Sequence, residues 1–494
     1  MPTLRAAPPG AKPPNSPRGT ARSRRAQLLA GAALGCMLAA CGGGGSGSAS
    51  TGGTGGGASS GSSGAVIVVG SATPLPSGAT RVDTLANVPW STLAAGTQVL
   101  VSPGSYHGLV AITAATGTQA APIVVAPFTA GQSPLLDDSV DIQQSAWLEV
   151  SGLSIAAPTY GGMIIRNASH HVTLSGNTIS GAPIGIQITA GAGTGNQILS
   201  NTIASSSGDG IDLEVNADAA DRTLVSANVI TDSGTHGIEL RASHYQIEHN
   251  TVSGSGRLTA GSSGIHVYSG GAGEDSGDDN LVRYNASYAN LDATTSDGNG
   301  IEIDQWCDGN TVSFNIAWSN DGAGIIVYDG NDNLVESNTL YANERDPGGT
   351  HAAGGADLVI GVSALQRSAA NVVRDNLVVA TRAATPAFHI NSGALANANV
   401  IGPNLYANTG GGGVVRWGDS STLATAALID SAAATSGNLV ETPAFADATQ
   451  PLADGLRLNA APSGDGVFLA SLSDRLGQVA ISGWSFFGAY FTKP

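Results

Sequence analysis

Charged, aromatic and sulfur-containing residues are all scarce in this chain of 494 residues. Only 12% of the residues are charged and 5% are aromatic, while 41% are hydrophobic, which is enough to form a core. Intrinsic disorder requires low hydrophobicity together with high net charge, so this composition excludes a disordered chain. Two of the three cysteines, Cys36 and Cys41, lie near the N-terminus, which leaves Cys307 alone in the body. The body therefore has no internal disulfide, and we expect its one thiol to be buried.

Basic residues become rare beyond the N-terminus. Six of the 20 basic residues and none of the 37 acidic ones precede residue 41, so 14 basic residues remain against 37 acidic ones. Lys493 is the only lysine in this remainder. A surface of this charge repels phosphate groups, so we expect no nucleic-acid partner. Sustained helical periodicity is also absent from residues 65–487, which excludes a mainly helical fold.

The first 40 residues have the pattern of an export signal. A basic stretch ends at Arg25, and the apolar run from Ala26 to Ala40 is too short to span a bilayer. The run ends in Leu-Ala-Ala-Cys-Gly at residues 38–42, which resembles the lipobox of bacterial lipoproteins. The resemblance implies that residues 1–40 are removed and that the thiol of Cys41 carries a lipid. It also implies a protein anchored to the membrane in the bacterial cell envelope, at the outer membrane or the cell surface; a plain secretory signal is the alternative.

Residues 41–64 follow as a linker made almost entirely of Gly, Ser, Ala and Thr. Such a linker behaves as a flexible coil with a reach of about 25–30 Å, which would hold the body away from the membrane.

Two sequence columns repeat through the body. One is the unit Gly-Ile-x-aliphatic, whose glycines are Gly185, Gly210, Gly237, Gly264, Gly300 and Gly324. The other is an asparagine after a short alternating run, at Asn177, Asn201, Asn228, Asn250, Asn285, Asn315, Asn338 and Asn376. Runs this short form strands of the usual length, and a repeat that cannot close a core alone must stack on its neighbours. The columns therefore predict an all-β solenoid with coils of three short strands.

The two columns together resemble the right-handed parallel β-helix of the pectate-lyase-like superfamily. The resemblance implies a three-sheet solenoid over residues 65–440, asparagines that hydrogen-bond along one turn, and capping segments at both ends. We assign the C-terminal cap to residues 441–494. A β-propeller is the rival fold, but its blades need about 40 residues and antiparallel hairpins.

Alternation along the Gly-Ile-x-aliphatic units predicts which side chains face outward. The isoleucine and the aliphatic residue point into the core, whereas x and the residue after the aliphatic one point out. Four consecutive units then present ionisable side chains, and we expect these to form an exposed stripe. Its members are Asp212, Glu214, Glu239, Arg241, His266, Tyr268, Glu302 and Asp304. Stacked coils lie about 4.8 Å apart, so the stripe spans about 14 Å, the length of a few sugar residues.

The inserted loops point to the same place. The longest insertions, residues 253–263, 269–279 and 288–298, flank His266 and Glu302. Long loops beside one stretch of a regular scaffold are where functional sites are usually built. In the superfamily the corresponding sheet carries a polysaccharide-binding cleft. The resemblance therefore implies a polysaccharide substrate bound by Asp212, Glu214 and Glu239, with Trp306 and Tyr328 available for stacking on sugar rings. We expect the protein to be a monomer.

Two reactions suit these groups, and a third class of function has no reaction at all. β-Elimination of a uronate polymer would use Arg241 or His266 as the base and Tyr268 as the acid, with calcium as the neutralising ion. The residues considered as calcium ligands are Asp212, Glu239, Glu302 and Asp304. Hydrolysis would instead use two carboxyl groups, such as Glu302 with Asp304 or Asp212 with Glu239. The third possibility is a surface β-helix that binds carbohydrate, or serves a structural role, without catalysis. We favour the lyase.

The sequence does not contain the complete motifs of either of two enzyme families that have this fold. Residues 296–322 are similar to a calcium-dependent pectate lyase family, in which Asp-Gly precedes a catalytic lysine. Here Glu302 stands nearest to the place of that lysine. The Gly-His-Gly motif of the related glycosidase family does not occur. The acidic residues 274–279 lack the ligand spacing of a known calcium loop, and the pair His170-His171 lacks a third ligand nearby in sequence.

Overall fold

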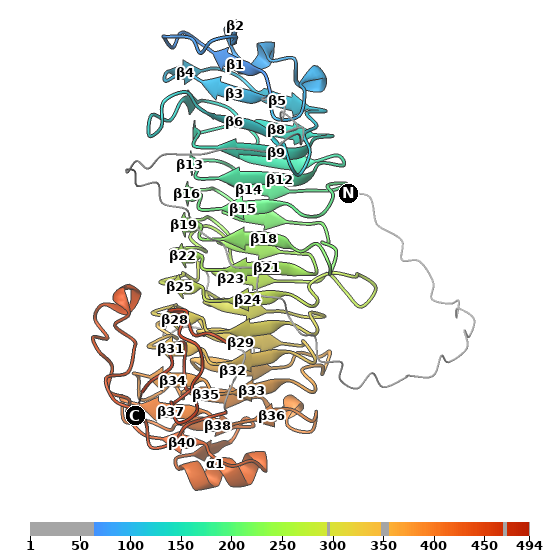
Figure 1. Ribbon diagram of the computed structural model, residues 1–494. Coiled ribbons are helices and arrows are strands. Elements are labelled where there is room, and N and C mark those ends of the chain that lie inside the picture. Colours follow the sequence, from blue (N-terminus) through green and yellow to red (C-terminus); the bar gives the residue numbers. More distant parts are fainter. Residues whose placement is uncertain (1–63, 294–296, 347–354, 468–471, 494) are drawn as a thin grey trace, which may run out of the picture. The chain divides into compact units, whose positions relative to one another are not determined.

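The computed structural model describes residues 64–293, 297–346, 355–467 and 472–493. The signal sequence, Cys41 and nearly all of the linker lie outside these residues. The described strands form three long sheets, here called A, B and C, each of which runs the length of the solenoid (Figure 1). Among the named pairs of neighbouring strands only β38 and β39 run antiparallel, and the other pairs are parallel. This topology confirms the predicted parallel β-helix and excludes a propeller, whose blades are antiparallel.

Each coil contributes one strand to each sheet. Sheet A consists of β1 (Val66–Val69), β2 (Thr80–Val82), β3 (Gln98–Val101), β6 (Ile123–Pro127), β9 (Ala146–Ser151), β12 (His170–Ser175), β15 (Gln197–Leu199), β18 (Thr223–Ser226), β21 (Tyr245–Glu248), β24 (Leu281–Arg283), β27 (Thr311–Ser313), β30 (Leu334–Glu336), β33 (Val372–Arg374) and β36 (Val400–Ile401). Sheet B consists of β4 (Ser105–Tyr106), β7 (Leu135–Leu136), β10 (Ser154–Ala156), β13 (Thr178–Ser180), β16 (Thr202–Ala204), β19 (Val229–Thr231), β22 (Thr251–Ser253), β25 (Ala286–Tyr288), β28 (Ile316–Trp318), β31 (Thr339–Tyr341), β34 (Leu377–Ala380), β37 (Leu405–Asn408) and β40 (Leu439–Val440). Sheet C consists of β5 (Val110–Thr113), β8 (Val140–Gln143), β11 (Met163–Arg166), β14 (Ile186–Ile188), β17 (Ile211–Leu213), β20 (Ile238–Leu240), β23 (Ile265–Val267), β26 (Ile301–Ile303), β29 (Ile325–Tyr328), β32 (Leu358–Gly361), β35 (Phe388–Ile390), β38 (Val415–Trp417) and β39 (Ser421–Leu423).

Helical segments are few and short. In the described residues the α-helix α1 covers Ala426–Ala433, and the 3₁₀ turns are η1 (Leu85–Asn87), η2 (Trp90–Thr92), η3 (Ser392–Ala394) and η4 (Pro451–Ala453). None of the helices in the described ranges combines the length and the apolar character that crossing a membrane requires.

The core is a set of stacked aliphatic columns, as the repeat predicts. Ile211, Ile238, Ile265 and Ile301 are fully buried in one continuous cluster. They occupy matching positions on successive strands of sheet C, because each is paired in register with the next.

The asparagine column forms a continuous ladder of hydrogen bonds. Asn228 Nδ2 donates to Asn250 Oδ1 at 2.9 Å and to the carbonyl of Ile198 at 2.8 Å. The same pattern links Asn177 through Asn376 and continues to Asn404, whose backbone N–H donates to Asn438. Two further ladders follow other turns, one from Asn280 to Asn399 and one from Asn290 to Asp357. Each ladder satisfies backbone groups at turns that would otherwise be buried without a partner.

We expect Asn315→Ala to lower the free energy of unfolding by about 2–4 kcal/mol. Asn315 is fully buried, and its side chain donates to Asn338 and to the carbonyl of Val282 while accepting from Asn285. The substitution would leave these buried partners unsatisfied. Denaturant unfolding measures the loss, with the exposed Asn87→Ala as the control. An equal, small effect of both substitutions would contradict a supporting role for the ladder.

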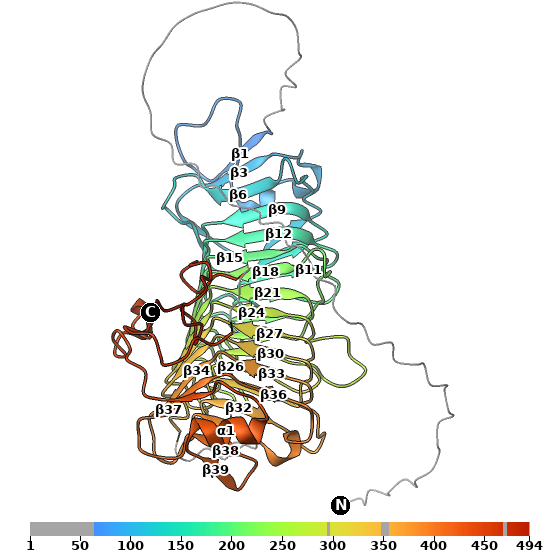
Figure 2. The same cartoon turned by 60° about the horizontal axis from the view of Figure 1, so that its bottom comes forward.

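Both ends of the solenoid are closed, but the C-terminal end is closed by a different segment from the one predicted. At the N-terminal end Leu85 and Trp90, from η1 and η2, are buried in the main core. At the other end α1 covers the last coils with the buried Ile429 (Figure 2). The segment predicted as the cap, residues 441–494, instead packs its described part along the outside of sheet B.

Outward side chains of sheet B explain this packing. They are apolar and aromatic where the tail lies, as at Trp318, against which Tyr490 packs. Phe491 stacks edge-on against Phe314 in the turn before β28. The tail thus covers an apolar side face rather than an open end.

Candidate active site

The outer face of sheet C brings four of the predicted residues into one column. Asp212 on β17, Glu239 on β20, His266 on β23 and Glu302 on β26 are paired in register, each with the next. Their neighbours in the strands are core residues, so these side chains point away from the core, as alternation predicts.

The prediction of an exposed stripe is wrong for this column. The exposed fractions of Asp212, Glu239, His266 and Glu302 are only 3%, 5%, 7% and 6%. Large side chains on adjacent coils and the inserted loops cover them. The accessible layer consists of the residues that follow each strand, namely Glu214, Arg241, Tyr268 and Asp304.

His266 is held as an imidazolium between two carboxylates. Its Nδ1 lies 2.6 Å from Glu239 Oε2 and its Nε2 lies 3.5 Å from Asp304 Oδ2. Burial opposes the charge, but Glu239 and the other carboxylates outweigh it and hold the pKa of His266 well above its ordinary value. The pKa of Glu239 is lowered because the effect of His266 outweighs that of burial.

His236 completes this cluster, and the sequence analysis missed it. Its ring stacks on His266 with centroids 4.3 Å apart and an interplanar angle of 8°. Its Nδ1 accepts the backbone N–H of Ser263, and its Nε2 lies 3.4 Å from Glu239. Burial, and then the charge of His266, lower the pKa of His236 to about 3, so this imidazole is neutral. Tyr268 stacks on His266, with ring centroids 5.6 Å apart.

A second acidic group lies on the other side of His266. Glu302 Oε2 accepts hydrogen bonds from Ser263 Oγ at 2.6 Å and from Asn299 Nδ2 at 3.0 Å. The same amide nitrogen of Asn299 also donates to Asp297. Burial and neighbouring carboxylates raise the pKa of Glu302, and burial together with Glu302 raises that of Asp297 to about 8. This pair of carboxyl groups therefore holds a proton near neutral pH.

Asp212 forms the third part of the site, beside Arg241. The Nη2 of Arg241 lies 3.8 Å from Asp212 Oδ1 and 3.8 Å from Glu214 Oε1, and its Nε lies 3.3 Å from Glu239. Asp212 Oδ1 accepts no hydrogen bond from the described residues. Burial, then Glu214 and Asp209, raise the pKa of Asp212 to about 7 in spite of Arg241. Arg241 itself has a raised pKa, because the surrounding carboxylates outweigh burial, and it stays charged.

The residues that the sequence analysis missed share one position in the repeat. Asp209, His236, Ser263 and Asn299 each precede the glycine of a Gly-Ile-x-aliphatic unit. Extending the repeat unit by one residue toward the N-terminus would have found them. Ser263 and Asp297 also come from two of the inserted loops, which confirms that these loops contribute to the cluster.

The four carboxylates predicted as calcium ligands do not form a single cluster. Among the described residues two groups of three could hold an ion, His236 with Glu239 and His266, and His266 with Glu302 and Asp304. Asp212 belongs to neither group. Both groups contain His266, whereas calcium takes oxygen ligands, so the donor sets do not fit calcium.

The two predicted stacking residues are partly covered. The guanidinium of Arg367 lies over the ring of Trp306, 4.3 Å from its centroid, and pairs with Asp308. Tyr328 packs beside Ile326 and Val359. Neither arrangement resembles a free aromatic platform for a sugar ring.

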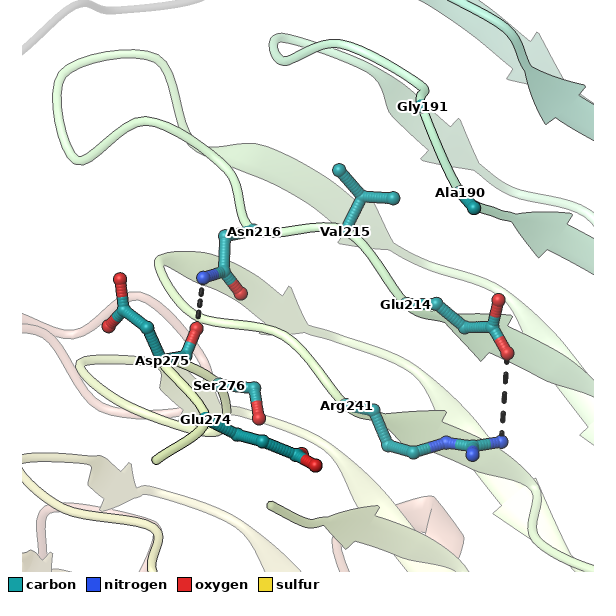
Figure 3. Close-up of a pocket in the computed structure, with 9 residues that line it drawn as sticks. All are labelled: Ala190, Gly191, Glu214, Val215, Asn216, Arg241, Glu274, Asp275 and Ser276. Carbon is teal, nitrogen blue, oxygen red and sulfur yellow. Dashed lines mark hydrogen bonds and ion pairs between the residues drawn. The ribbon is translucent and has the colours of Figure 1, made fainter. Parts of the chain in front are cut away.

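An open cavity of about 580 Å³ borders the accessible layer (Figure 3). Glu214 and Arg241 form one side, and Glu274, Asp275 and Ser276 of the acidic loop form the other. Asn216 Nδ2 hydrogen-bonds the carbonyl of Asp275 and ties this loop to the sheet. The cavity gives a ligand access to Arg241 and Glu214, whereas Asp212, 3.8 Å from Arg241, is not among its lining residues.

Two family models match the chain. Residues 123–303 match "Periplasmic copper-binding protein (NosD)", and residues 240–427 match "Right handed beta helix region". No protein of curated function has a sequence that matches this chain.

Solved structures with a similar backbone are distant in sequence. The alginate lyase of Paenibacillus sp. strain FPU-7 shares 18% identity over 57% of this chain and 95% of its own, with a TM-score of 0.41. The pectate lyase Pel9A shares 15% identity over 87% of this chain and 96% of its own, with a TM-score of 0.47. The A-module of the mannuronan C-5 epimerase AlgE4 of Azotobacter vinelandii shares 12% identity over 70% and 89%, with a TM-score of 0.45. The family models and the three parallel sheets together identify this chain as a right-handed parallel β-helix protein.

Proposed function

We propose that this chain cleaves an extracellular polysaccharide by β-elimination at a uronate residue. One observation carries the proposal: Asp212, with a carboxylate oxygen free of hydrogen bonds and a pKa of about 7, lies beside the charged Arg241. A base works best when its pKa is near the operating pH, and a cation next to it can neutralise the substrate carboxylate.

The site supplies one group for each requirement of the reaction. Asp212 takes the C5 proton, Arg241 binds the uronate carboxylate, and Tyr268 gives a proton to the leaving oxygen as the C4–O bond breaks. Asp212, Arg241 and Tyr268 belong to three successive coils about 4.8 Å apart, so they follow the direction of a bound chain. Arg241 and His266 therefore act as fixed positive charges rather than as the base considered from the sequence.

A calcium ion is not part of this mechanism. The carboxylates predicted to hold it are separated, and the cationic side chains Arg241 and His266 occupy the space between them. The neutralising role falls to Arg241.

Hydrolysis is the second candidate, because Glu302 and Asp304 are held in different environments. Burial raises the pKa of Glu302, which favours its protonated form, whereas Asp304 faces His266. Successive outward positions on one strand are about 6.7 Å apart, within the range of about 6.5–9.5 Å typical of inverting glycosidases. Glu302 would then be the acid and Asp304 the base for water.

A panel of uronate and neutral polysaccharides tests these proposals. Elimination produces unsaturated ends that absorb in the ultraviolet, together with an equal number of reducing ends. Hydrolysis produces reducing ends alone, and a non-catalytic binding protein produces neither. We expect absorbing ends from at least one polyuronate; reducing ends alone would favour Glu302 with Asp304 instead.

We further propose that a lipid on Cys41 anchors the protein in the cell envelope. Cys41→Ser is expected to release the protein from the membrane fraction and to abolish labelling with palmitate, because one thiol carries the lipid. Cys36→Ser is the matched control and should leave both unchanged. A Cys41→Ser protein that still labels and sediments with membranes would contradict the anchor.

A further inference from the structure

A groove on sheet A lies apart from the candidate active site on sheet C. It has a volume of about 200 Å³ and is lined by side chains from β9, β12, β15 and the turns before them. Trp147 and His171 form one outward column of the sheet here, and Glu149, Thr173 and Gln197 form the next column. We propose that this groove binds a segment of a neutral polysaccharide without cleaving it.

The aromatic side of the groove is rigid. The rings of Trp147 and His171 stack with centroids 3.9 Å apart. Both nitrogens of His171 are engaged, Nδ1 with His170 at 2.8 Å and Nε2 with Asp221 at 3.3 Å. Thr194 Oγ1 donates to the same oxygen of Asp221 at 3.0 Å, so the loop carboxylate is fixed as well. A preorganised wall loses little conformational entropy when a ligand binds.

Gly195 makes this arrangement possible. It follows His171 by one coil, and a Cβ at this position would lie 2.7 Å from Asp221 Oδ2 and 2.8 Å from the ring of His171. Any side chain there would displace the pair that fixes the wall. The pair His170-His171, which lacks a third ligand in sequence, thus serves to position an aromatic surface.

The neighbouring column supplies polar groups at a regular spacing. Glu149, Thr173 and Gln197 are paired in register on three successive strands. They span two coil steps, about 10 Å, and offer a carboxylate, a hydroxyl and an amide to the groove. Sugar hydroxyls both donate and accept, and repeat along a polysaccharide, so this set matches consecutive sugar rings. The groove is smaller than the about 300–1,000 Å³ of drug-sized ligand sites, which suits one narrow chain.

The charge of the groove selects against acidic glycans. Its lining contains the carboxylate of Glu149 and no arginine or lysine. A polyuronate would be repelled there, whereas the active-site face presents Arg241. The proposal does not rest on the proposed reaction, because the groove belongs to a different sheet.

Calorimetric titration of the full-length protein with neutral hexasaccharides of β-1,4-glucan, β-1,4-xylan, β-1,4-mannan and α-1,4-glucan tests this inference. None of these probes contains a uronate residue, so the elimination proposed for sheet C does not consume them. We expect saturable binding of at least one of these probes. Glu149→Gln and Gln197→Ala should each weaken it by about 3–10-fold through lost hydrogen bonds, and Trp147→Ala by tenfold or more.

Gln246→Ala is the matched control. Gln246 lies in the same outward column of sheet A two coils beyond Gln197 and outside the groove, so binding should not change. Because Trp147→Ala can fail to fold, the exposed Gln197→Ala keeps the test decisive. Absence of binding by all four probes, or binding that Glu149→Gln and Gln197→Ala leave unchanged, would overturn the proposal. Neither result would bear on the reaction at Asp212.

Discussion

Asp212→Asn is expected to lower the rate of polysaccharide cleavage by about 10²–10⁴-fold, the usual contribution of a positioned general base. The asparagine keeps the shape of the side chain but cannot take a proton. Stability should change little or rise near pH 8, because the fold raises the pKa of Asp212 to about 7 and thereby disfavours its charged form. Initial rates and denaturant unfolding measure the two effects.

Asp141→Asn is the matched control. Asp141 occupies the same outward column of sheet C three coils away, paired with Arg166, and should keep the wild-type rate. The wild-type rate should rise with pH through about 7 and level off above it, since only the ionised form of Asp212 is a base. Full activity of Asp212→Asn, or a rate that falls across this range, would place the base elsewhere.

His266→Ala is expected to lower the free energy of unfolding by about 3–5 kcal/mol as well as to lower activity. His266 is nearly buried, and its removal takes the cation from between Glu239 and Asp304, which leaves Glu239 paired with Arg241 alone. A position on the outer face of a sheet would ordinarily tolerate this change within about 0.5 kcal/mol. The large effect follows from the covering loops, which exclude water from the ion pairs.

The pH dependence of the stability loss distinguishes an effect of the charge on His266 from an effect of its packing. Because the folded pKa of His266 lies above its unfolded value, its contribution is fully present below about pH 6.5. The contribution is lost as the pH rises through the folded pKa, so the difference between wild type and His266→Ala should shrink in alkali. The exposed His107→Ala should show no such loss. A difference that is small, or independent of pH, would mean that His266 is not charged in the fold.

Columns of residues were predictable from the sequence because each coil repeats the same alternation. The inward position of Ile211 and its equivalents, the ladder through Asn228 and Asn250, and the alignment of Asp212 with Glu302 all follow from register. Alternation, however, gives only the direction of a side chain. It does not show that the outer face is covered, and so His266 was expected on an open surface.

Contacts between non-repeating parts could not be predicted in this way. His236 and Asn299 occupy a repeated position before the glycine of their units, but their stacking and hydrogen bonds depend on turn conformations that vary from coil to coil. The tail illustrates the same limit. It was predicted to cap the open end of the solenoid, but the fold shows that it covers Trp318 of sheet B and Phe314 in the turn before that strand.

The mass of the cleavage products formed in water enriched with oxygen-18 separates elimination from hydrolysis. Elimination adds no water, so we expect unsaturated oligosaccharides that contain no label and are lighter than hydrolytic products by one water molecule. Asp212→Asn should not form them, whereas Asp141→Asn should. Saturated products that carry one labelled oxygen at each new reducing end would show that Asp212 is not the base of an elimination.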